Sequence, residues 1–290
     1  MNILFLGGTR FFGVHAVRAL LARGHAVTLL TRGITEDPFG DSVQRIHADR
    51  ASAPDMLAAL DGRHYDIVCD NIAYCSNDVR ALLDAVSCDR YVLTSSASVY
   101  PTLALRTPES AFDPLAYPLS WCSRADHTYD EIKRQGECAL FQAYPAIRGT
   151  ALRYTYVVGE DDYTRRLRFY VAHVLTGKPM HLENPEGHIS FIRSDEAGRF
   201  LAWSAEQDFT GPINANSTGT VAHGDIVAYV EEKTGRKAVF SPDGEPCPYN
   251  GDDSFSLDVS RADDLGFTFT DVNNWFHPLL DALIKECAAS

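Results

Sequence analysis

Residues 2–13 set the fold of this chain and read NILFLGGTRFFG. The mostly apolar run Asn2–Leu6 is a strand candidate that leads into two glycines. An amphipathic helical pattern follows over residues 14–23, and a second apolar run spans residues 26–30. The result is a strand-helix-strand unit of about 30 residues, which is the building block of parallel α/β sheets.

The alternation of strands and helices continues beyond this unit. Apolar runs at residues 45–48, 67–69 and 91–93 alternate with helical patterns at residues 54–60 and 78–86. Parallel strands need crossover connections, and helical crossovers cover both faces of the sheet. We therefore predict an α/β fold, a doubly wound parallel Rossmann sheet whose ligand site lies outside the carboxyl ends of its strands.

The sequence pattern changes after a further strand candidate at residues 151–158. We predict a Rossmann domain over residues 1–158, completed by roughly residues 191–216. A smaller, discontinuous C-terminal α/β lobe, formed mainly by residues 159–290, would bind the substrate. The elements expected after residue 158 are helices at 166–175, 191–205, 224–233 and 273–287, a strand at 212–216 and a loop at 241–254.

Composition narrows the class of protein. The 290 residues are 45% hydrophobic and 22% charged, as in an ordinary globular protein. The formal net charge of −13 argues against broad nucleic-acid binding, which needs a basic surface. No stretch approaches the roughly 18 to 20 apolar residues of a membrane span and no basic leader precedes the first strand, so we expect a cytoplasmic protein. Seven cysteines without a Cys-x-x-Cys pair predict reduced thiols and no metal site.

The glycine turn is a candidate dinucleotide site. Glycine is needed where a chain turns sharply and where the backbone must approach a pyrophosphate, and the following helix meets the phosphate charge with free N–H groups. A tight turn without a ligand is the alternative. Arg10 stands where such turns usually carry glycine. The candidate cofactor-binding residues of the turn are Gly7, Thr9, Arg10, Phe11, Phe12 and Gly13.

Two further positions bear on which dinucleotide is bound. A carboxylate normally ends the second strand and binds the ribose hydroxyls of NAD, but Arg32 occupies that place. A guanidinium there, with Arg10 nearby, suits the 2′-phosphate of NADP, so we expect NADP to be favoured over NAD. Asp49, at the end of the third strand, either accepts a hydrogen bond from the adenine amino group or caps the following helix.

Residues 129–133 read YDEIK and place a phenol and an ammonium four residues apart. In a helix both side chains leave the same face, and a cation beside Tyr129 stabilises its phenolate, which suits the tyrosine to proton transfer. Ser96 closes one strand and Asn71 follows the preceding one, so both face the ligand edge of the sheet. Tyr74 also follows that strand, and it either lines the cofactor cleft at this edge or packs against neighbouring side chains. The alternatives are that Tyr129 and Lys133 form a solvent-exposed pair on the helix surface, and that Ser96 only caps a turn.

Together these stretches resemble the extended short-chain dehydrogenase/reductase superfamily, which contains nucleotide-sugar epimerases and dehydratases. The Gly-Gly-Thr-Arg-Phe turn is most similar to a subgroup of bacterial proteins of unassigned activity and plant chloroplast stem-loop-RNA-binding proteins. The resemblance implies that Ser96 holds the reacting oxygen and that Tyr129 transfers a proton while nicotinamide C4 exchanges hydride. It implies that Lys133 binds the nicotinamide ribose and lowers the pKa of the phenol, and that the protein is a homodimer. The stretches that carry the resemblance are residues 7–13, 93–100, 129–133, 191–195, 211–215 and 265–267.

The chain departs from that superfamily where a substrate diphosphate would bind. His188 and Tyr249 stand where nucleotide-sugar members carry arginines, so another guanidinium would have to bind the diphosphate. Tyr154 replaces a proline after Arg153, a change that we expect to reshape the nicotinamide pocket. The arginines available as substitutes are Arg165, Arg166, Arg168 and Arg193, of which the first three also fit a solvated helix face.

We predict an NAD(P)-dependent enzyme of the epimerase/dehydratase or reductase type that acts on a nucleotide sugar or a small carbonyl or hydroxyl compound. The alternative is a catalytically silent dinucleotide-binding protein that serves as an RNA-binding or regulatory module. The acidic net charge and the intact pair of Tyr129 and Lys133 favour the enzyme.

Overall fold

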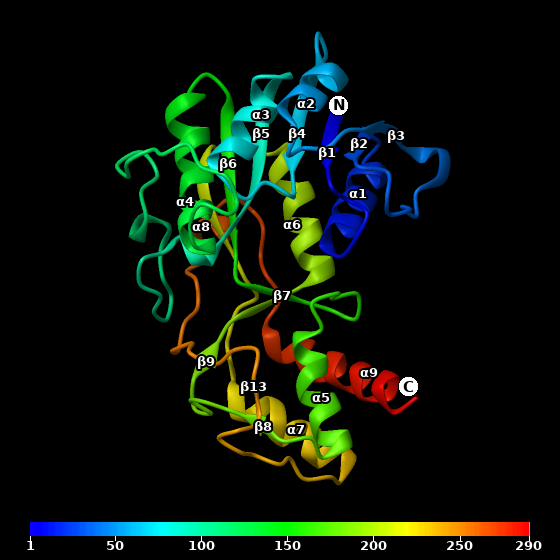
Figure 1. Ribbon diagram of the computed structural model, residues 1–290, viewed down its shortest axis with the longest axis vertical. Helices are drawn as coiled ribbons and strands as arrows, with labels where there is room; N and C mark the ends of the chain where they lie inside the picture. Colours follow the sequence, from blue (N-terminus) through cyan, green and yellow to red (C-terminus); the bar gives the residue numbers. More distant parts are fainter. Residues whose placement is uncertain (290) are drawn as a thin grey trace.

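The computed structural model describes residues 1–289, so Ser290, the last residue of the predicted lobe, lies outside the described residues. Its largest element is a seven-stranded sheet in the order β11-β6-β5-β4-β1-β2-β3, with every neighbouring pair parallel (Figure 1). The chain winds outward in both directions from β1 and β4, which confirms the doubly wound fold. The strands are β1 (Asn2–Leu6), β2 (Ala26–Thr31), β3 (Gln44–His47), β4 (His64–Asp70), β5 (Ser87–Ser96), β6 (Arg148–Tyr154) and β11 (Gly211–Ala215).

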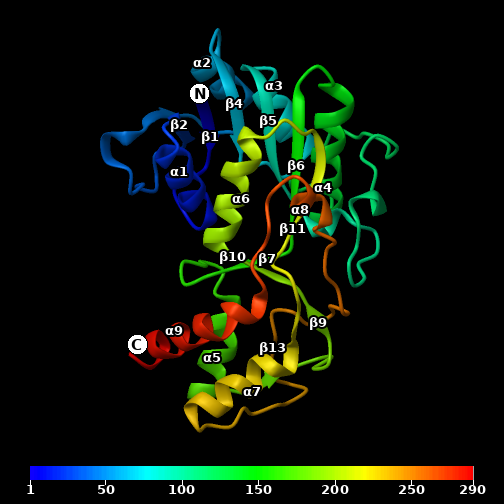
Figure 2. The same ribbon diagram turned by 180° about the vertical axis from the view of Figure 1, so that it is seen from behind.

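Alternate side chains of the central strand β1 pack into two different cores. Ile3 and Phe5 pack with residues of α1 and α6, whereas Leu4 and Leu6 pack with residues of α2 and α3. Both faces of the strand are therefore buried, which explains its apolar sequence. Helices lie on both faces of the sheet (Figure 1 and Figure 2). They are α1 (Phe12–Ala22), α2 (Ala53–Leu60), α3 (Ser76–Leu83), α4 (Tyr129–Cys138), which a π-helical turn (Ala139–Ala143) extends, and α6 (Ser194–Glu206).

The C-terminal lobe has an apolar core of its own. Phe191 lies at its centre, with its ring centroid 5.0 Å from that of Phe276 and 5.3 Å from that of Tyr249. The chain leaves the lobe to form α6 and β11 and then returns, so the lobe is discontinuous.

The domain boundary at residue 158 stays a prediction. The remaining elements are α5 (Arg166–Thr176), α7 (His223–Thr234), α9 (Phe276–Ala288), β8 (Met180–His181), β9 (His188–Ile189), β12 (Val221–Ala222) and β13 (Glu245–Pro246), with α8 (Ser260–Asp264) beside β11.

Two sequence-predicted elements differ most from the structure, and the loop expected over residues 241–254 also contains the short strand β13. The helix expected over residues 191–205 is instead a strand, β10 (Phe191–Arg193), followed by α6. β10 pairs with β7 (Tyr156–Val158), and its first two residues are buried, so a paired strand satisfies both backbone and side chains. The strand expected over residues 151–158 is interrupted at Thr155, because β6 belongs to the large sheet and β7 pairs with β10.

None of the helices formed by residues 1–289 combines the length and the apolar character that crossing a membrane requires. All seven cysteines are free thiols, and five of them are buried.

Candidate functional site

The glycine turn joins β1 to α1 at the carboxyl edge of the sheet. Gly7 and Gly8 have φ angles of 89° and 85°, which residues with a side chain rarely adopt. At Gly13 a Cβ atom would lie 2.8 Å from Nδ2 of Asn71, so a side chain has no room there. Phe11 has φ 54° and ψ −145°, a strained conformation that the closely packed turn maintains. The turn therefore presents backbone and the N-terminus of α1 in the way that phosphate binding requires.

Two other residues of the turn have different surroundings. Phe12, the first residue of α1, packs its ring 5.5 Å from that of Tyr154 and supports the turn from the core side. Thr9 borders a groove of about 670 Å³ between the turn and the lobe. Tyr154 is buried in the core beside Phe12, and its effect on the shape of a nicotinamide pocket stays a prediction.

Arg10 and Arg32 border the same loop. A guanidinium nitrogen of Arg10 donates to Oγ1 of Thr35 at 3.0 Å, and Arg32 directly follows β2 at the start of that loop. Both arginines are exposed. The structure thus brings the two predicted guanidiniums to one side of the cleft, next to the end of β2.

Asp49 lies between the end of β3 and α2 but does not cap the helix. Ser52 is the N-cap of α2, and its hydroxyl accepts a hydrogen bond from the N–H of Asp55 at 3.3 Å. The Asp49 carboxylate instead accepts from the N–H of Ala51 at 3.0 Å. The helix-cap alternative for Asp49 is therefore wrong, and its contact with adenine stays a prediction.

Ser96 and Tyr129 lie side by side at the edge of the sheet. Ser96 ends β5, and its hydroxyl accepts a hydrogen bond from the N–H of Ser98 at 3.1 Å, so the turn-cap alternative is confirmed for this serine. Tyr129 begins α4, and hydrogen bonding from the Ser96 side chain to the phenol favours the phenolate. Tyr129 is 50% exposed, yet burial within the cleft raises its pKa, and the bond from Ser96 and the charge of Arg166 only partly oppose that shift. Ser95 points elsewhere and donates to the buried carboxylate of Glu137 at 2.5 Å.

Lys133 lies one turn further along α4 and is only 6% exposed. Its ammonium donates to the carbonyl oxygens of Ala73 and Thr94, both at 2.9 Å. It lies 4.8 Å from the ring centroid of Tyr74 and 5.9 Å from that of Tyr129. Burial lowers the pKa of Lys133 to about 8, although nearby carboxylates oppose the shift. The pKa of the Tyr129 phenol is raised overall, because burial outweighs the hydrogen bond from Ser96 and the charge of Arg166, and a lowering contribution from Lys133 stays a prediction.

Asn71 connects the glycine turn to the tyrosine side of the cleft. Its N–H donates to the carbonyl of Leu6 at 3.2 Å, and its Oδ1 accepts from the hydroxyl of Thr94 at 2.9 Å. The ends of β1, β4 and β5 are thereby tied together. The structure brings the turn, Asn71, Ser96, Tyr129 and Lys133 to one edge of the sheet, as the strand-end argument predicts.

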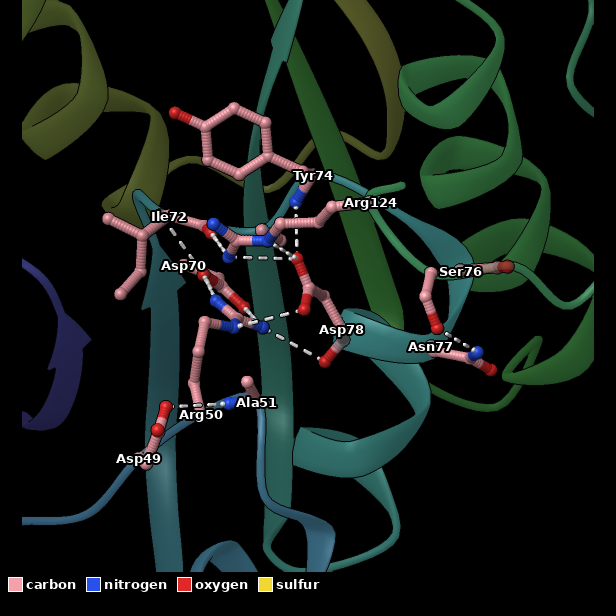
Figure 3. Close-up of polar contacts among 12 residues, drawn as sticks. Asp49, Arg50, Ala51, Asp70, Ile72, Tyr74, Ser76, Asn77, Asp78 and Arg124 are labelled. Atoms are coloured by element: carbon pink, nitrogen blue, oxygen red, sulfur yellow. Dashed lines mark hydrogen bonds and ion pairs between the residues drawn. The ribbon is translucent and has the colours of Figure 1, made fainter. Parts of the chain in front are cut away.

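A buried charge cluster supports this edge, and the sequence did not reveal it (Figure 3). Arg50 donates to both carboxylate oxygens of Asp70, at 2.5 and 2.9 Å, and lies 3.6 Å from the carboxylate of Asp78. The hydroxyl of Tyr91 also donates to Asp70, at 2.8 Å. All four residues are buried, so each charge depends on its partners. The only signal in the sequence is a carboxylate that follows the apolar run of β4.

A second buried ion pair joins β6 to α4. The guanidinium of Arg153 lies 2.6 Å from the carboxylate of Glu137, and neither side chain is exposed. Arg153 also donates to the hydroxyl of Tyr100 at 3.1 Å and to the carbonyls of Glu109 and Phe112 at 2.8 and 3.0 Å. It therefore holds the segment after β5 against the sheet and takes a structural role.

The lobe residues considered above for binding a substrate diphosphate have different charged neighbours. Tyr249, in place of one arginine, is buried in the lobe core and 1% exposed. Arg166 begins α5 and lies 5.0 Å from the ring centroid of Tyr156. Within residues 1–289 its hydrogen bonds go to neutral oxygens, those of Thr164 and Val157. Two other candidate arginines already have carboxylate partners. These ion pairs are Arg168 with Glu286 and Arg193 with Asp195.

Solved structures share this fold along the whole chain. The UDP-glucose 4-epimerase of Thermotoga maritima is 17% identical with a TM-score of 0.76, over 100% of this chain and 99% of that chain. The UDP-glucuronic acid 4-epimerase of Bacillus cereus, solved with NAD, is 19% identical with a TM-score of 0.72, over 99% of this chain and 100% of that chain. At these identities the likeness shows the fold.

Among curated proteins, the chloroplast stem-loop binding protein of 41 kDa b of Arabidopsis thaliana is 26% identical over 205 residues. The alignment covers 65% of this chain and 50% of that protein, so the chain spans about half the length of this relative. The model of the NAD dependent epimerase/dehydratase family matches residues 3–213, which contain the glycine turn, Ser96, Tyr129 and Lys133. Since the match covers most of the chain, this protein belongs to the NAD dependent epimerase/dehydratase family.

Proposed function

We propose that this protein is an NAD(P)-dependent enzyme that epimerises, dehydrates or reduces a nucleotide sugar or a small carbonyl or hydroxyl compound. The observation that carries the proposal is the meeting of Ser96, Tyr129 and Lys133 at the sheet edge beside the glycine turn. Membership of the NAD dependent epimerase/dehydratase family supports it independently of that geometry.

The glycine turn fits the pyrophosphate of a dinucleotide. The absence of a Cβ atom at Gly13 lets the start of α1 pack closely against Asn71 and Gly8, and the N-terminus of that helix offers free N–H groups to a phosphate. Asn71 would line the cleft, and the Asp49 carboxylate would accept a hydrogen bond from the adenine amino group. When bound, the nicotinamide exchanges a hydride with the reacting carbon of the substrate.

Arg10 and Arg32 would select NADP. Both guanidiniums border the loop after β2, where a ribose 2′-phosphate would add two negative charges. No carboxylate occupies the position after β2 that binds the ribose hydroxyls of NAD in other Rossmann folds. We therefore expect NADP(H) to bind more tightly than NAD(H).

Ser96 and Tyr129 would act on the same oxygen of the substrate. The Ser96 hydroxyl would hold that oxygen while the Tyr129 hydroxyl gives or takes its proton. Because the pKa of Tyr129 is raised, the phenol carries its proton at neutral pH and is suited to donate it. Lys133 would bind the nicotinamide ribose, since an ammonium has three donors and two of them go to Ala73 and Thr94.

Nucleotide sugars are the favoured substrate class, because the similar solved structures are named for UDP-sugars. The diphosphate of such a substrate needs a cationic partner, and Arg166 is the best candidate. It is partly exposed, its hydrogen bonds go to neutral oxygens, and its charge reaches Tyr129. This part of the proposal predicts that substrates with a diphosphate bind more weakly to Arg166→Ala.

A screen of nucleotide sugars and small carbonyl compounds, read by nicotinamide absorbance, would identify the substrate. With that substrate, Tyr129→Phe is expected to bind the dinucleotide as tightly as the unmodified protein and to lose turnover by at least about a hundredfold. The phenylalanine keeps the ring but removes the proton-transfer group. Turnover that survives the substitution would remove Tyr129 from the mechanism.

An RNA-binding role is the second candidate, favoured by the likeness to the chloroplast stem-loop binding protein. The net charge of −13 opposes it. Retention of stem-loop RNA on a filter that falls with salt and survives Tyr129→Phe would favour this role. We also propose a homodimer from the superfamily resemblance and a cytoplasmic location from the sequence pattern. Sedimentation of the purified chain as a monomer would reject the dimer.

A further inference from the structure

An arginine outside the predicted site reaches the cleft from an irregular segment. We call this segment, residues 112–128, the strap; it leads directly into α4. The guanidinium of Arg124 in the strap donates to the carbonyl of Ile72 at 2.9 Å and to the carboxylate of Asp78 at 3.1 Å. It also lies 4.3 Å from the ring centroid of Tyr74, and Figure 3 shows it beside that ring.

The groups that Arg124 contacts belong to the loop between β4 and α3 or anchor it. This loop carries Ala73, whose carbonyl accepts from the ammonium of Lys133. Its backbone is fixed on both sides, by carboxylates that accept its N–H groups and by cations that donate to its carbonyls. The four bonds are from the N–H of Ile72 to Asp70 (3.2 Å), from the N–H of Tyr74 to Asp78 (2.8 Å), from Arg124 to the carbonyl of Ile72 (2.9 Å) and from Lys133 to the carbonyl of Ala73 (2.9 Å).

The ring of Tyr74 links the same two cations. Arg124 lies 4.3 Å and Lys133 lies 4.8 Å from its centroid, within the range at which an aromatic ring attracts a cation. The ring is also in edge contact with Tyr129, at 6.1 Å between centroids. Removing Arg124 would therefore take away one of the four bonds that fix the loop and one of the two cations that hold the ring beside the Lys133 ammonium.

We propose that Arg124 is a positioning residue for the nicotinamide half of the cofactor: it fixes the loop and the Tyr74 ring so that the remaining donor of Lys133 meets the nicotinamide ribose. The proposal rests on the role of Lys133 in the proposed function. The adenine half depends on other groups, namely the turn at residues 7–13 and the Asp49 carboxylate. Substitution of Arg124 therefore weakens only the binding of ligands that reach Lys133.

A ligand pair separates positioning from a general loss of structure. NADPH carries both halves of the cofactor, whereas adenosine 2′,5′-bisphosphate carries only the adenine half; NADH and ADP form the corresponding pair if NAD is preferred. In Arg124→Gln the dissociation constant of the dinucleotide is expected to rise about tenfold, and that of the fragment to change less than twofold. Arg124→Lys keeps the charge and is expected to recover most of the loss.

Two further variants complete the experiment. Lys133→Met should reproduce the same pattern, with the dinucleotide weakened and the fragment unchanged. Arg80→Gln is the matched control, because Arg80 also contacts the strap, 4.5 Å from the ring of Trp121, without touching the loop. It should leave both constants unchanged. If Arg124→Gln does not fold, Tyr74→Leu removes the ring contact and is expected to give the same split between ligands.

The outcomes distinguish this inference from the proposed function. If Lys133→Met weakens NADPH but Arg124→Gln does not, the positioning role is wrong and the proposed function stands. If Arg124→Gln weakens dinucleotide and fragment equally, Arg124 acts on the fold as a whole, and the inference is overturned. If Lys133→Met leaves NADPH binding intact, the role of Lys133 and the inference built on it both fail.

Discussion

At the scale of residues, Lys133 and Tyr129 leave the same face of α4 but experience different surroundings. The spacing in the sequence predicts the shared face, and the structure has it. The spacing does not predict that backbone carbonyls take two donors of the ammonium, or that burial governs both pKa values. These depend on Ala73 and Thr94, which are remote in sequence.

Lys133 should give stability a pH dependence of known sign. Its pKa in the folded protein is about 8, below the ordinary 10.5, so between these values the unfolded chain binds more protons than the folded one. The contribution of Lys133 to the free energy of unfolding therefore rises with pH between these two pKa values. We expect the free energy of unfolding of the unmodified protein, minus that of Lys133→Met, to increase from pH 8 to pH 10 in urea titrations. A difference that stays constant or falls over this pH range would contradict a buried Lys133 with a lowered pKa.

Arg32 offers a residue-level test of cofactor choice. Replacing it with alanine removes one of the two guanidiniums placed for a 2′-phosphate, so NADPH should bind about tenfold or more weakly. The dissociation constant of NADH should hardly change, because NADH has no such phosphate. Arg63→Ala, on the exposed loop after α2, serves as a control for loss of charge alone. Equal losses for NADPH and NADH would contradict the assignment.

At the scale of elements, local pattern predicts most strands and helices but fails where tertiary pairing decides. Residues 191–205 have a helical pattern over most of their length, yet the first three form β10, because β7 lies beside them. The pairing partner is more than thirty residues away in sequence. The glycine turn, by contrast, is predictable because strand, glycines and helix are contiguous.

The glycine turn gives a prediction at this scale. In Gly13→Ala the added methyl would meet Nδ2 of Asn71 at 2.8 Å and Cα of Gly8 at 3.1 Å, so the turn must shift. We expect a destabilisation of about 1–3 kcal/mol and a weaker dinucleotide complex, measured by thermal unfolding and fluorescence titration. Gly136→Ala is the control, since its nearest neighbour would be 3.7 Å away, and a helical alanine should be neutral or stabilising. Unchanged cofactor binding in Gly13→Ala would argue against a pyrophosphate at the turn.

At the scale of the whole molecule, the sequence predicts the parallel sheet and the edge at which the site lies. It does not predict the buried ion pairs that support this edge, Arg50 with Asp70 and Arg153 with Glu137. Each pair joins charges from elements that meet only in the folded chain. The same limit applies to the substrate, because chains with 17% and 19% identity share the fold, and a shared fold does not identify a ligand.

The central claim is that a pyridine dinucleotide lies across the carboxyl edge of the sheet with its reactive ring at Tyr129. A crystal structure of the protein with NADPH tests it most directly. We expect the pyrophosphate over residues 7–13, the 2′-phosphate at Arg10 and Arg32, and the nicotinamide facing the hydroxyls of Ser96 and Tyr129. A dinucleotide bound elsewhere, or with its nicotinamide turned away from Tyr129, would contradict the account.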